Sequence, residues 1–138
     1  QFAPWAPLIF TSSVTGQNVT KLFDLALDID TERHKRIKTP ELNRWLRSAV
    51  DLHPPAGLKN RSPKLNYIVQ EDDNPTPAFK VFGSHTTYLH WSYKRYLEHS
   101  MRDKFGFNGT AIQLWFIEKH ITHKHGESPS FGINKRGK

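Results

Sequence analysis

The sequence predicts an α+β domain whose elements follow the order helix, strand, strand, helix, strand. Apolar residues recur every three or four positions in two stretches, 39–53 and 87–105, as they do in amphipathic helices. Apolar and polar residues alternate at 64–71, and a returning strand follows at 78–82 after a turn rich in Asp, Asn and Pro, which is typical of a β-hairpin. A three-stranded sheet completed by residues 111–117, with the helices packed on one face, buries these apolar stripes.

A strand and a helix precede this domain. Residues 7–11 form a short apolar run that predicts a strand, and residues 18–30 carry one apolar face that predicts a helix. One strand and one helix cannot bury both faces of each other, so we expect the end of a larger α/β domain. Because the chain opens with Gln1 and shows no signal-peptide pattern, we also expect a piece of a longer protein.

The first helix of the α+β domain has recognisable ends. Thr39 is expected to cap it, Pro40 suits its first turn, and Glu41 favours the positive end of the helix. Pro54, followed by a second proline, stops it. The basic stretch 31–38 before this helix is expected to be a linker.

The hairpin, the long helix and the last strand complete the predicted sheet. Leu65, Tyr67 and Val69 are expected to share one face of the first strand. Gly106 ends the long helix. Strand, helix and strand from 78 to 117 form a right-handed crossover, which makes the sheet mixed. The residues expected to be mostly buried are Trp45, Leu46, Tyr93, Leu97 and Trp115.

Charge and cysteine content limit the classes of function. The chain has 20 Lys and Arg against 13 Asp and Glu, a formal net charge of +7 and a pI near 9.8, which favours polyanionic partners, nucleic acid first. The absence of cysteine excludes a disulfide framework, a thiolate zinc site and a cysteine nucleophile, and it favours a reducing compartment. No apolar run approaches the roughly 20 residues of a membrane-spanning helix, so we expect no membrane partner.

Five motifs together resemble a known family. IFTSSVTGQNVTKLFDLAL, at 9–27, is followed in order by TPELNRWL, HPP, SYKRYLE and FGFNGTAIQL. The chain resembles the C-terminal end of the Der (EngA) family, bacterial GTPases with two tandem G domains and a C-terminal KH-like domain. The first motif is similar to the last strand, the fifth guanine-nucleotide motif and the final helix of a G domain, and the other four are similar to the KH-like domain. Ser13 stands where the family usually has Ala, and the long basic tail lies outside the resemblance.

The resemblance implies three parts and a role. They are a G-domain strand and helix with a basic linker at 1–36, a KH-like domain at 37–119, and a basic tail at 120–138 that is expected to be flexible. The implied parent is a GTP-binding protein required for assembly of the large ribosomal subunit, in the bacterial cytoplasm or, alternatively, an organelle matrix. Its implied partners are large-subunit rRNA, the ribosome and the parent's own G domains, and its implied cofactors are GTP and Mg.

The chain itself lacks the parts that phosphoryl transfer needs. It contains no G-x-x-x-x-G-K-[ST] phosphate loop and no Asn-Lys-x-Asp motif. We therefore expect no catalytic residue, cofactor, metal or small-molecule substrate for the fragment alone. In the intact parent, the resemblance implies that Ser12, Ser13 and Val14 contact the nucleotide. In the fragment, this turn is expected only to satisfy local backbone groups.

Basic side chains are the strongest RNA candidates, since Lys and Arg contact phosphates without reading sequence. The segment Gly106 to Gly109 spells the G-x-x-G clamp of KH domains. It joins a helix to a strand rather than two helices, so a helix cap and a turn explain its glycines better. Trp91 can either stack a base or pack on a neighbouring domain. The candidate RNA-binding residues are Arg33, Lys35, Arg36, Lys38, Lys59, Arg61, Lys119 and Lys124.

Histidines suggest other chemistry only weakly. His120, His123 and His125 have a spacing that zinc can use, but the tail is a poor cage, and we expect solvated side chains. His99 and His53 each lie beside a carboxylate on a helix with no nucleophile in view, so a surface role is expected.

Two functions follow from these observations. The first is RNA and ribosome docking for a GTPase of ribosome assembly. The alternative is a protein-interaction module that packs against the parent's G domains and reports the nucleotide they hold. RNA binding that depends steeply on salt favours the first, and salt-insensitive binding to the G domains favours the second.

Overall fold

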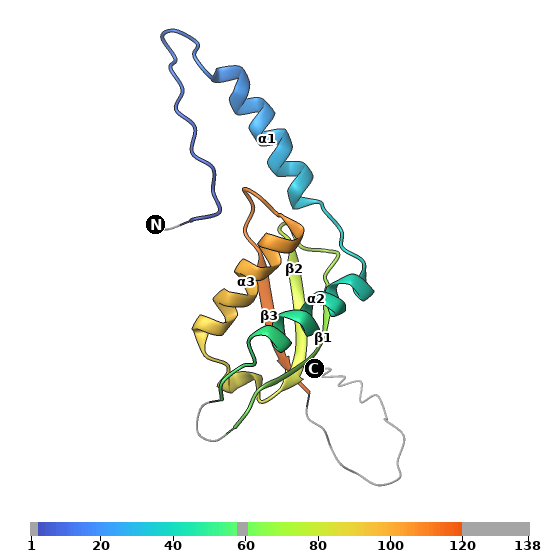
Figure 1. Cartoon of the computed structure of the whole chain (residues 1–138). Coiled ribbons are helices and arrows are strands. Elements are labelled where there is room, and N and C mark those ends of the chain that lie inside the picture. The colour runs from blue at the N-terminus through green and yellow to red at the C-terminus, as the bar shows by residue number, and fades with distance from the viewer. Residues whose placement is uncertain (1–2, 58–60, 120–138) are drawn as a thin grey trace, which may run out of the picture.

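The computed structural model describes residues 3–57 and 61–119 (Figure 1). Its helical elements are α1 (Val19–Arg33), α2 (Thr39–Leu52), the short 3₁₀ helix η1 (Thr86–Tyr88) and α3 (Trp91–Phe105). Its strands are β1 (Lys64–Gln70), β2 (Ala78–Ser84) and β3 (Gln113–Glu118). From α2 onwards the order is helix, strand, strand, helix, strand, which confirms the predicted α+β class.

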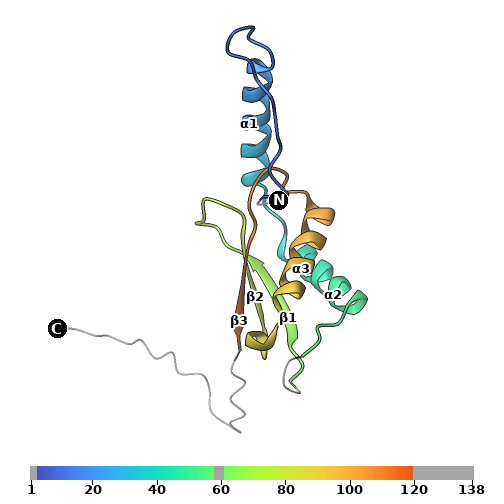
Figure 2. The same ribbon diagram turned by 90° about the vertical axis from the view of Figure 1, so that its left-hand side faces the viewer.

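The three strands form one mixed sheet in the order β1-β2-β3. β1 and β2 are antiparallel, as expected for a hairpin. β2 and β3 are neighbouring parallel strands, and α3 connects them in the chain. Figure 2 shows α2 and α3 together on one side of the sheet, as predicted, while nothing in the described ranges covers its other face. No helix among the described residues is long and apolar enough to cross a membrane.

The core lies between the sheet and its two helices. Leu42 and Leu46 of α2 meet Phe79 and Val81 of β2 and Leu97 of α3, and all five are buried almost completely. The predicted burial of Trp45, Leu46 and Leu97 is confirmed.

The prediction that Leu65, Tyr67 and Val69 share one face of β1 was wrong. An irregularity in the pairing between Leu65 and Tyr67 shifts the register, so that Ile68 opposes Val81 in the core. Because successive side chains in a strand point to opposite faces, one extra residue exchanges the faces for all that follow. Tyr67 is 42% exposed, whereas Leu65 packs against the core and Ile68 lies in it.

Trp115 was also placed wrongly. It lies opposite Lys80 in the register, on the uncovered face of the sheet, and remains 39% exposed. Its neighbours Leu114 and Phe116 point to the helices instead. Tyr93, expected to be mostly buried, is only partly so.

The long helix expected at 87–105 is interrupted. His85 has a left-handed backbone (φ 55°) and Leu89 is extended, so η1 and α3 are separate elements. The Nδ1 atom of His90 accepts a hydrogen bond from the Ser92 amide at 3.2 Å and caps α3. α3 therefore begins four residues later than predicted, at Trp91.

The elements around the linker differ in detail from the prediction. α1 continues to Arg33, so it takes up the start of the predicted linker. Lys38, rather than Thr39, occupies the N-cap of α2 and makes no side-chain cap, while Pro40 lies in the first turn as expected. Residues 7–11 do not form the predicted strand, because no described strand runs beside them to complete a hydrogen-bonded ladder.

Candidate nucleic-acid interface

The predicted basic linker is largely occupied by internal contacts. Arg33 forms an ion pair with Asp30 at 3.2 Å. Arg36 pairs with Asp72 and donates a hydrogen bond to the backbone oxygen of Glu71 at 2.8 Å. These guanidinium groups already face carboxylates, so their charge is partly neutralised before any phosphate approaches.

Lys35 belongs to a contact that joins α1 to the loop after α3. Its ammonium group binds Glu32 at 2.6 Å and the backbone oxygen of Phe105 at 3.0 Å. The Glu32 carboxylate also accepts a hydrogen bond from the Phe107 amide at 2.7 Å. The hydrogen bond from Lys35 is the largest of the effects that lower the pKa of Glu32 below 4.5, and they outweigh the opposing effect of burial.

Replacing Glu32 with glutamine should destabilise the chain at neutral pH but much less in acid. Because the folded state lowers the pKa of Glu32, the carboxylate stabilises the fold above the unfolded pKa near 4.5. This contribution is lost as pH falls through the folded pKa. Urea unfolding at a series of pH values should show the difference between wild type and Glu32→Gln shrinking below about pH 4.5. The exposed Asp103, replaced by asparagine, serves as control, and a difference that stays constant down to the lowest pH would argue against this role.

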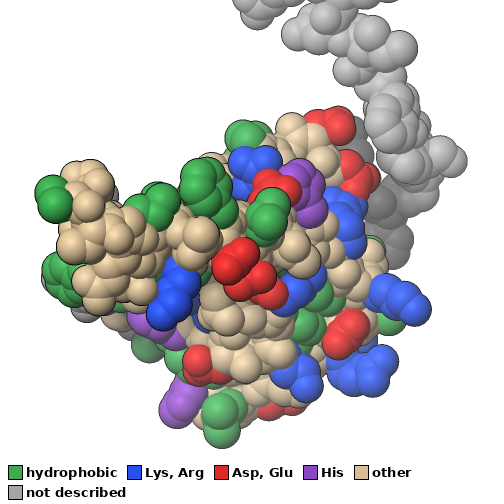
Figure 3. Space-filling model, turned by 90° about the horizontal axis from the view of Figure 1, so that it is seen from above, with side chains coloured by type: hydrophobic (Ala, Val, Ile, Leu, Met, Phe, Trp, Pro, Cys, Tyr) green, Lys and Arg blue, Asp and Glu red, His purple; other side chains and the backbone are tan. Residues whose placement is uncertain are grey.

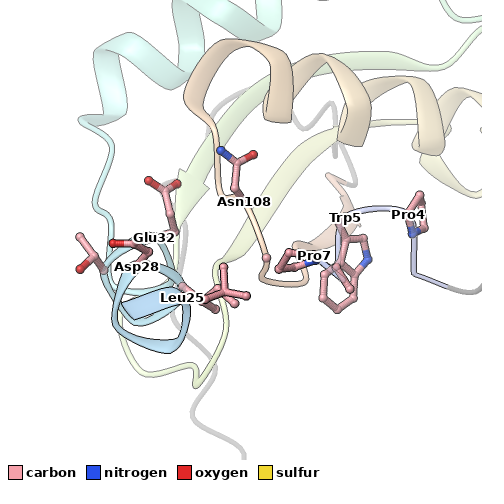
Figure 4. Close-up of a pocket in the computed structure, with 11 residues that line it drawn as sticks. Pro4, Trp5, Pro7, Leu25, Asp28, Glu32 and Asn108 are labelled. Carbon is pink, nitrogen blue, oxygen red and sulfur yellow. The ribbon is translucent and has the colours of Figure 1, made fainter. Parts of the chain in front are cut away.

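A cavity of about 520 Å³ lies beside this contact, between the N-terminal segment, α1 and the loop after α3. Figure 4 shows Asp28 and Glu32 on α1, Asn108 on the loop, and Trp5 on the N-terminal segment around it. The Gly109 amide donates a hydrogen bond to the Trp5 backbone oxygen at 3.1 Å. The loop is therefore held from two sides by segments that precede α2.

The G-x-x-G segment is part of the packed structure. Phe107 is fully buried, with its ring edge-on to Phe79 at 5.8 Å. A Cβ atom at Gly109 would lie 2.5 Å from Ile29 Cγ1 on α1, and the positive φ of Gly109 (77°) disfavours other residues as well. With a buried centre and α1 against its end, the loop lacks the open backbone that a nucleic-acid clamp presents.

The turn at Ser12, Ser13 and Val14 makes the local backbone hydrogen bonds expected of it in the fragment. Ser12 Oγ accepts a hydrogen bond from the Thr15 amide at 3.2 Å, and its backbone oxygen accepts one from Gly16 at 2.9 Å. Ser13 and Val14 are exposed. Their contact with a nucleotide in a longer parent stays a prediction.

A basic groove forms where the start of α2 meets the end of α3. It is a cavity of about 500 Å³ into which Lys38, Arg44 and Lys104 project, with Trp45 and Ser48 as further lining. Seen from above (Figure 3), Lys and Arg side chains lie on the right-hand side, interspersed with Asp and Glu, while hydrophobic side chains lie at the edges of the protrusion at the left.

The cations of the basic groove take no part in the ion pairs of the described residues. Among the described residues, no carboxylate lies within ion-pairing distance of Lys38, Arg44 or Lys104. The groove lining holds one carboxylate, Glu41, against these three cations. Unpaired cations that converge from two packed helices can contact phosphates without first breaking an ion pair.

Only Lys38 of this groove was among the predicted RNA-binding residues. Arg44 lies on the polar face of α2, opposite its apolar stripe, and Lys104 lies on α3, sixty positions along the chain. The apolar stripe of α2 in the sequence could have predicted that Arg44 lies on the exposed, polar face of this helix. The approach of Lys104 depends on how α2 and α3 pack, which no local pattern contains.

The remaining candidates are scattered. The Arg61 guanidinium lies over the Tyr88 ring at 5.4 Å, and Lys119 is exposed after β3. Lys59, Lys124 and the histidines of the tail fall outside the described residues. Within residues 3–57 and 61–119, no group of three His, Cys, Asp or Glu side chains is arranged to hold a metal ion.

Comparison with known proteins identifies the family to which this chain belongs. Residues 36–116 match the model of a family described as the KH-domain-like of EngA bacterial GTPase enzymes, C-terminal. The chain belongs to this family. The matched span of the EngA domain begins just before α2 and ends within β3, so it contains every residue of the basic groove.

Curated relatives carry the name GTPase Der. The chain is 47% identical to the protein of Thermomicrobium roseum over 118 residues, covering 86% of this chain and 25% of the relative. It is 43% identical to that of Chloroflexus aggregans over 117 residues (84% and 26%) and 44% identical to that of Herpetosiphon aurantiacus over 116 residues (83% and 25%). The chain thus spans about a quarter of the length of these EngA relatives.

Proposed function

We propose that this chain is the RNA- and ribosome-docking module of a GTP-binding protein required for assembly of the large ribosomal subunit. The observation that carries the proposal is the basic groove, whose three cations meet no carboxylate among the described residues. The KH-like family assignment and the GTPase Der name of the relatives supply the context.

Phosphate binding is the chemistry that this groove supports. Lys38 and Arg44 come from the start of α2 and Lys104 from the end of α3, so the scaffold holds their backbones in place. Contacts between such side chains and phosphates give affinity without base recognition. In this proposal the bacterial cytoplasm is where the module meets rRNA. GTP and Mg bind to G domains of the parent, where Ser12, Ser13 and Val14 lie beside the nucleotide.

The binding of a large-subunit rRNA fragment should depend steeply on salt. If the three groove cations each contact one phosphate, the logarithm of affinity should fall with the logarithm of salt concentration with a slope of about −2, at roughly −0.7 per contact for single strands. A salt titration of the full chain by fluorescence anisotropy measures this slope. Absence of binding at low salt, or a slope near zero, would contradict the proposal.

A second candidate function rests on the apolar surface of the N-terminal segment and α1. Leu8, Phe10 and Val14 are 78–94% exposed, and Phe23 and Leu27 of α1 are exposed as well. Such a surface suits the rest of a G domain, and the contact of Glu32 with the loop after α3 would then pass a change there to the KH-like domain. Binding of separately produced parent G domains that persists in high salt would support this candidate.

A further inference from the structure

A second cavity lies at the far end of the contact between α2 and α3, and it shares no lining residue with the basic groove. The two helices run antiparallel: Trp45 Nε1 donates a hydrogen bond to Ser100 Oγ at 3.1 Å near one end, and the Tyr93 hydroxyl donates one to the His53 backbone oxygen at 2.6 Å near the other. Between them, the Tyr96 hydroxyl donates a hydrogen bond to the backbone oxygen of Ala49 in α2 at 2.9 Å. The basic groove therefore lies at one end of this helix pair and the second cavity at the other.

The other end is an aromatic pocket of about 370 Å³. Its walls include the rings of His53, His90, Tyr93 and Tyr96, and the His53 ring meets Tyr96 edge-on at 5.0 Å. Burial, and to a lesser extent Tyr96, raises the pKa of Tyr93 to about 12, so this phenol stays neutral and places no negative charge in the pocket.

The rim of the aromatic pocket presents a further ring to solvent. Trp91, the first residue of α3, is 61% exposed, and its ring lies 5.5 Å from that of His90. The Arg95 guanidinium lies over the same ring at 5.5 Å. A flat aromatic surface with an adjacent cation is the kind of platform on which bases of single-stranded nucleic acids stack.

We propose that the aromatic pocket and Trp91 bind unpaired nucleobases of a single-stranded RNA segment whose phosphates lie in the basic groove. This inference rests on the proposed docking function and adds what that function leaves open, namely the class of RNA. Every base has a π-face, so stacking here tolerates sequence but requires unpaired bases.

The uncovered face of the sheet is a weaker candidate for the same role. Tyr67 and Trp115 are partly exposed there, but its central cation, Lys80, is already paired with Glu71 at 2.9 Å. The α2–α3 contact instead has rings at one end and, at the other, cations that meet no carboxylate among the described residues. This difference decides between the two aromatic surfaces, and it also supplies a matched control.

The test compares a single-stranded RNA of about eight nucleotides with an abasic ribose-phosphate chain of the same length, within the roughly 4–16 nucleotides that single-strand sites cover. The protein is the full chain as wild type, Trp91→Ala and Trp115→Ala. The wild type should bind the base-containing RNA at least about tenfold more tightly, since each stacked base contributes roughly 5- to 150-fold. Trp91→Ala should lose about fivefold or more on this RNA and nothing on the abasic chain. Trp115→Ala should change neither.

The outcomes separate this inference from the function on which it rests. If the wild type bound the RNA and the abasic chain with equal affinity, and neither Trp91→Ala nor Trp115→Ala changed that affinity, base binding would be overturned while phosphate docking stayed in place. A loss confined to Trp115→Ala would overturn it in favour of the sheet face. Absence of binding to either chain at low salt would overturn both proposals, and tight binding of a proline-rich peptide in competition with RNA would assign the pocket to protein.

Discussion

Replacing Phe107 with alanine should lower the free energy of unfolding by about 3–5 kcal/mol, as large-to-small changes of buried aromatic residues do. Phe107 is fully buried, packs edge-on against Phe79, and lies 5.6 Å below the Lys35 ammonium group. Alanine keeps the same left-handed backbone requirement (φ 59°), so the effect comes from lost packing rather than from new strain. Urea unfolding followed by circular dichroism measures it.

The exposed Trp91, replaced by alanine, is the matched control for Phe107. It removes an even larger ring from the same domain, yet most surface changes alter stability by roughly 0.5 kcal/mol or less. A loss below about 1 kcal/mol for Phe107→Ala would contradict the packing described for the loop after α3. In that case the G-x-x-G segment would be open enough to act as a clamp.

Replacing Arg44 and Lys104 together with alanine should weaken rRNA binding by about 150-fold or more at low salt, since hydrogen bonds to charged groups contribute roughly 1.5–3 kcal/mol each and two are lost. The salt slope should flatten by about 1.4 units, or 0.7 for each lost contact. Both side chains line the basic groove without an ion pair among the described residues. Anisotropy titrations at several salt concentrations measure both effects.

The double replacement of Arg33 and Arg36 by alanine controls for net charge. It removes the same two charges, but each of these guanidinium groups already faces a carboxylate, Asp30 or Asp72. We expect less than a threefold loss of affinity, because long-range attraction between exposed charges is screened by salt. If this control lost more affinity than the groove variant, the linker would be the docking site instead.

Local patterns in the sequence were sufficient for the elements of the domain. The apolar stripe of α2 and Pro40 in its first turn predicted that helix almost to the residue, and the hairpin and the parallel return of β3 followed from alternation and connection rules. These features depend on residues close together in the chain, so a single sequence is enough to predict them.

The errors in the core and at the basic groove share one physical cause, which is packing between distant segments. Tyr67 does not share a face with Leu65 because a pairing irregularity shifts β1, and Trp115 faces outward because of its register with β2. The approach of Lys104 to Arg44 likewise comes from the crossing of two helices. None of these leaves a mark in local composition, so the basic groove could only be recognised in three dimensions.

For the G-x-x-G segment, by contrast, local sequence was sufficient to predict its role. Gly106 and Gly109 spell a known clamp, yet their position between a helix and a strand predicted an ordinary cap and turn. The structure places Ile29 of α1 against Gly109, which adds a reason that local sequence did not contain. A Gly109→Asp variant therefore disturbs the contact with α1 as well as any RNA contact, and it is a poor probe of binding.

Mapping amide chemical shifts on the full chain during titration with a short single-stranded rRNA segment tests the central claim most directly. The account predicts that the perturbed amides lie at both ends of the α2–α3 contact, around Lys38 and Arg44 in the basic groove and around His53 and Trp91 at the aromatic pocket. Shifts confined to the G-x-x-G loop or to the uncovered sheet face around Trp115, with α2 and α3 unchanged, would contradict it.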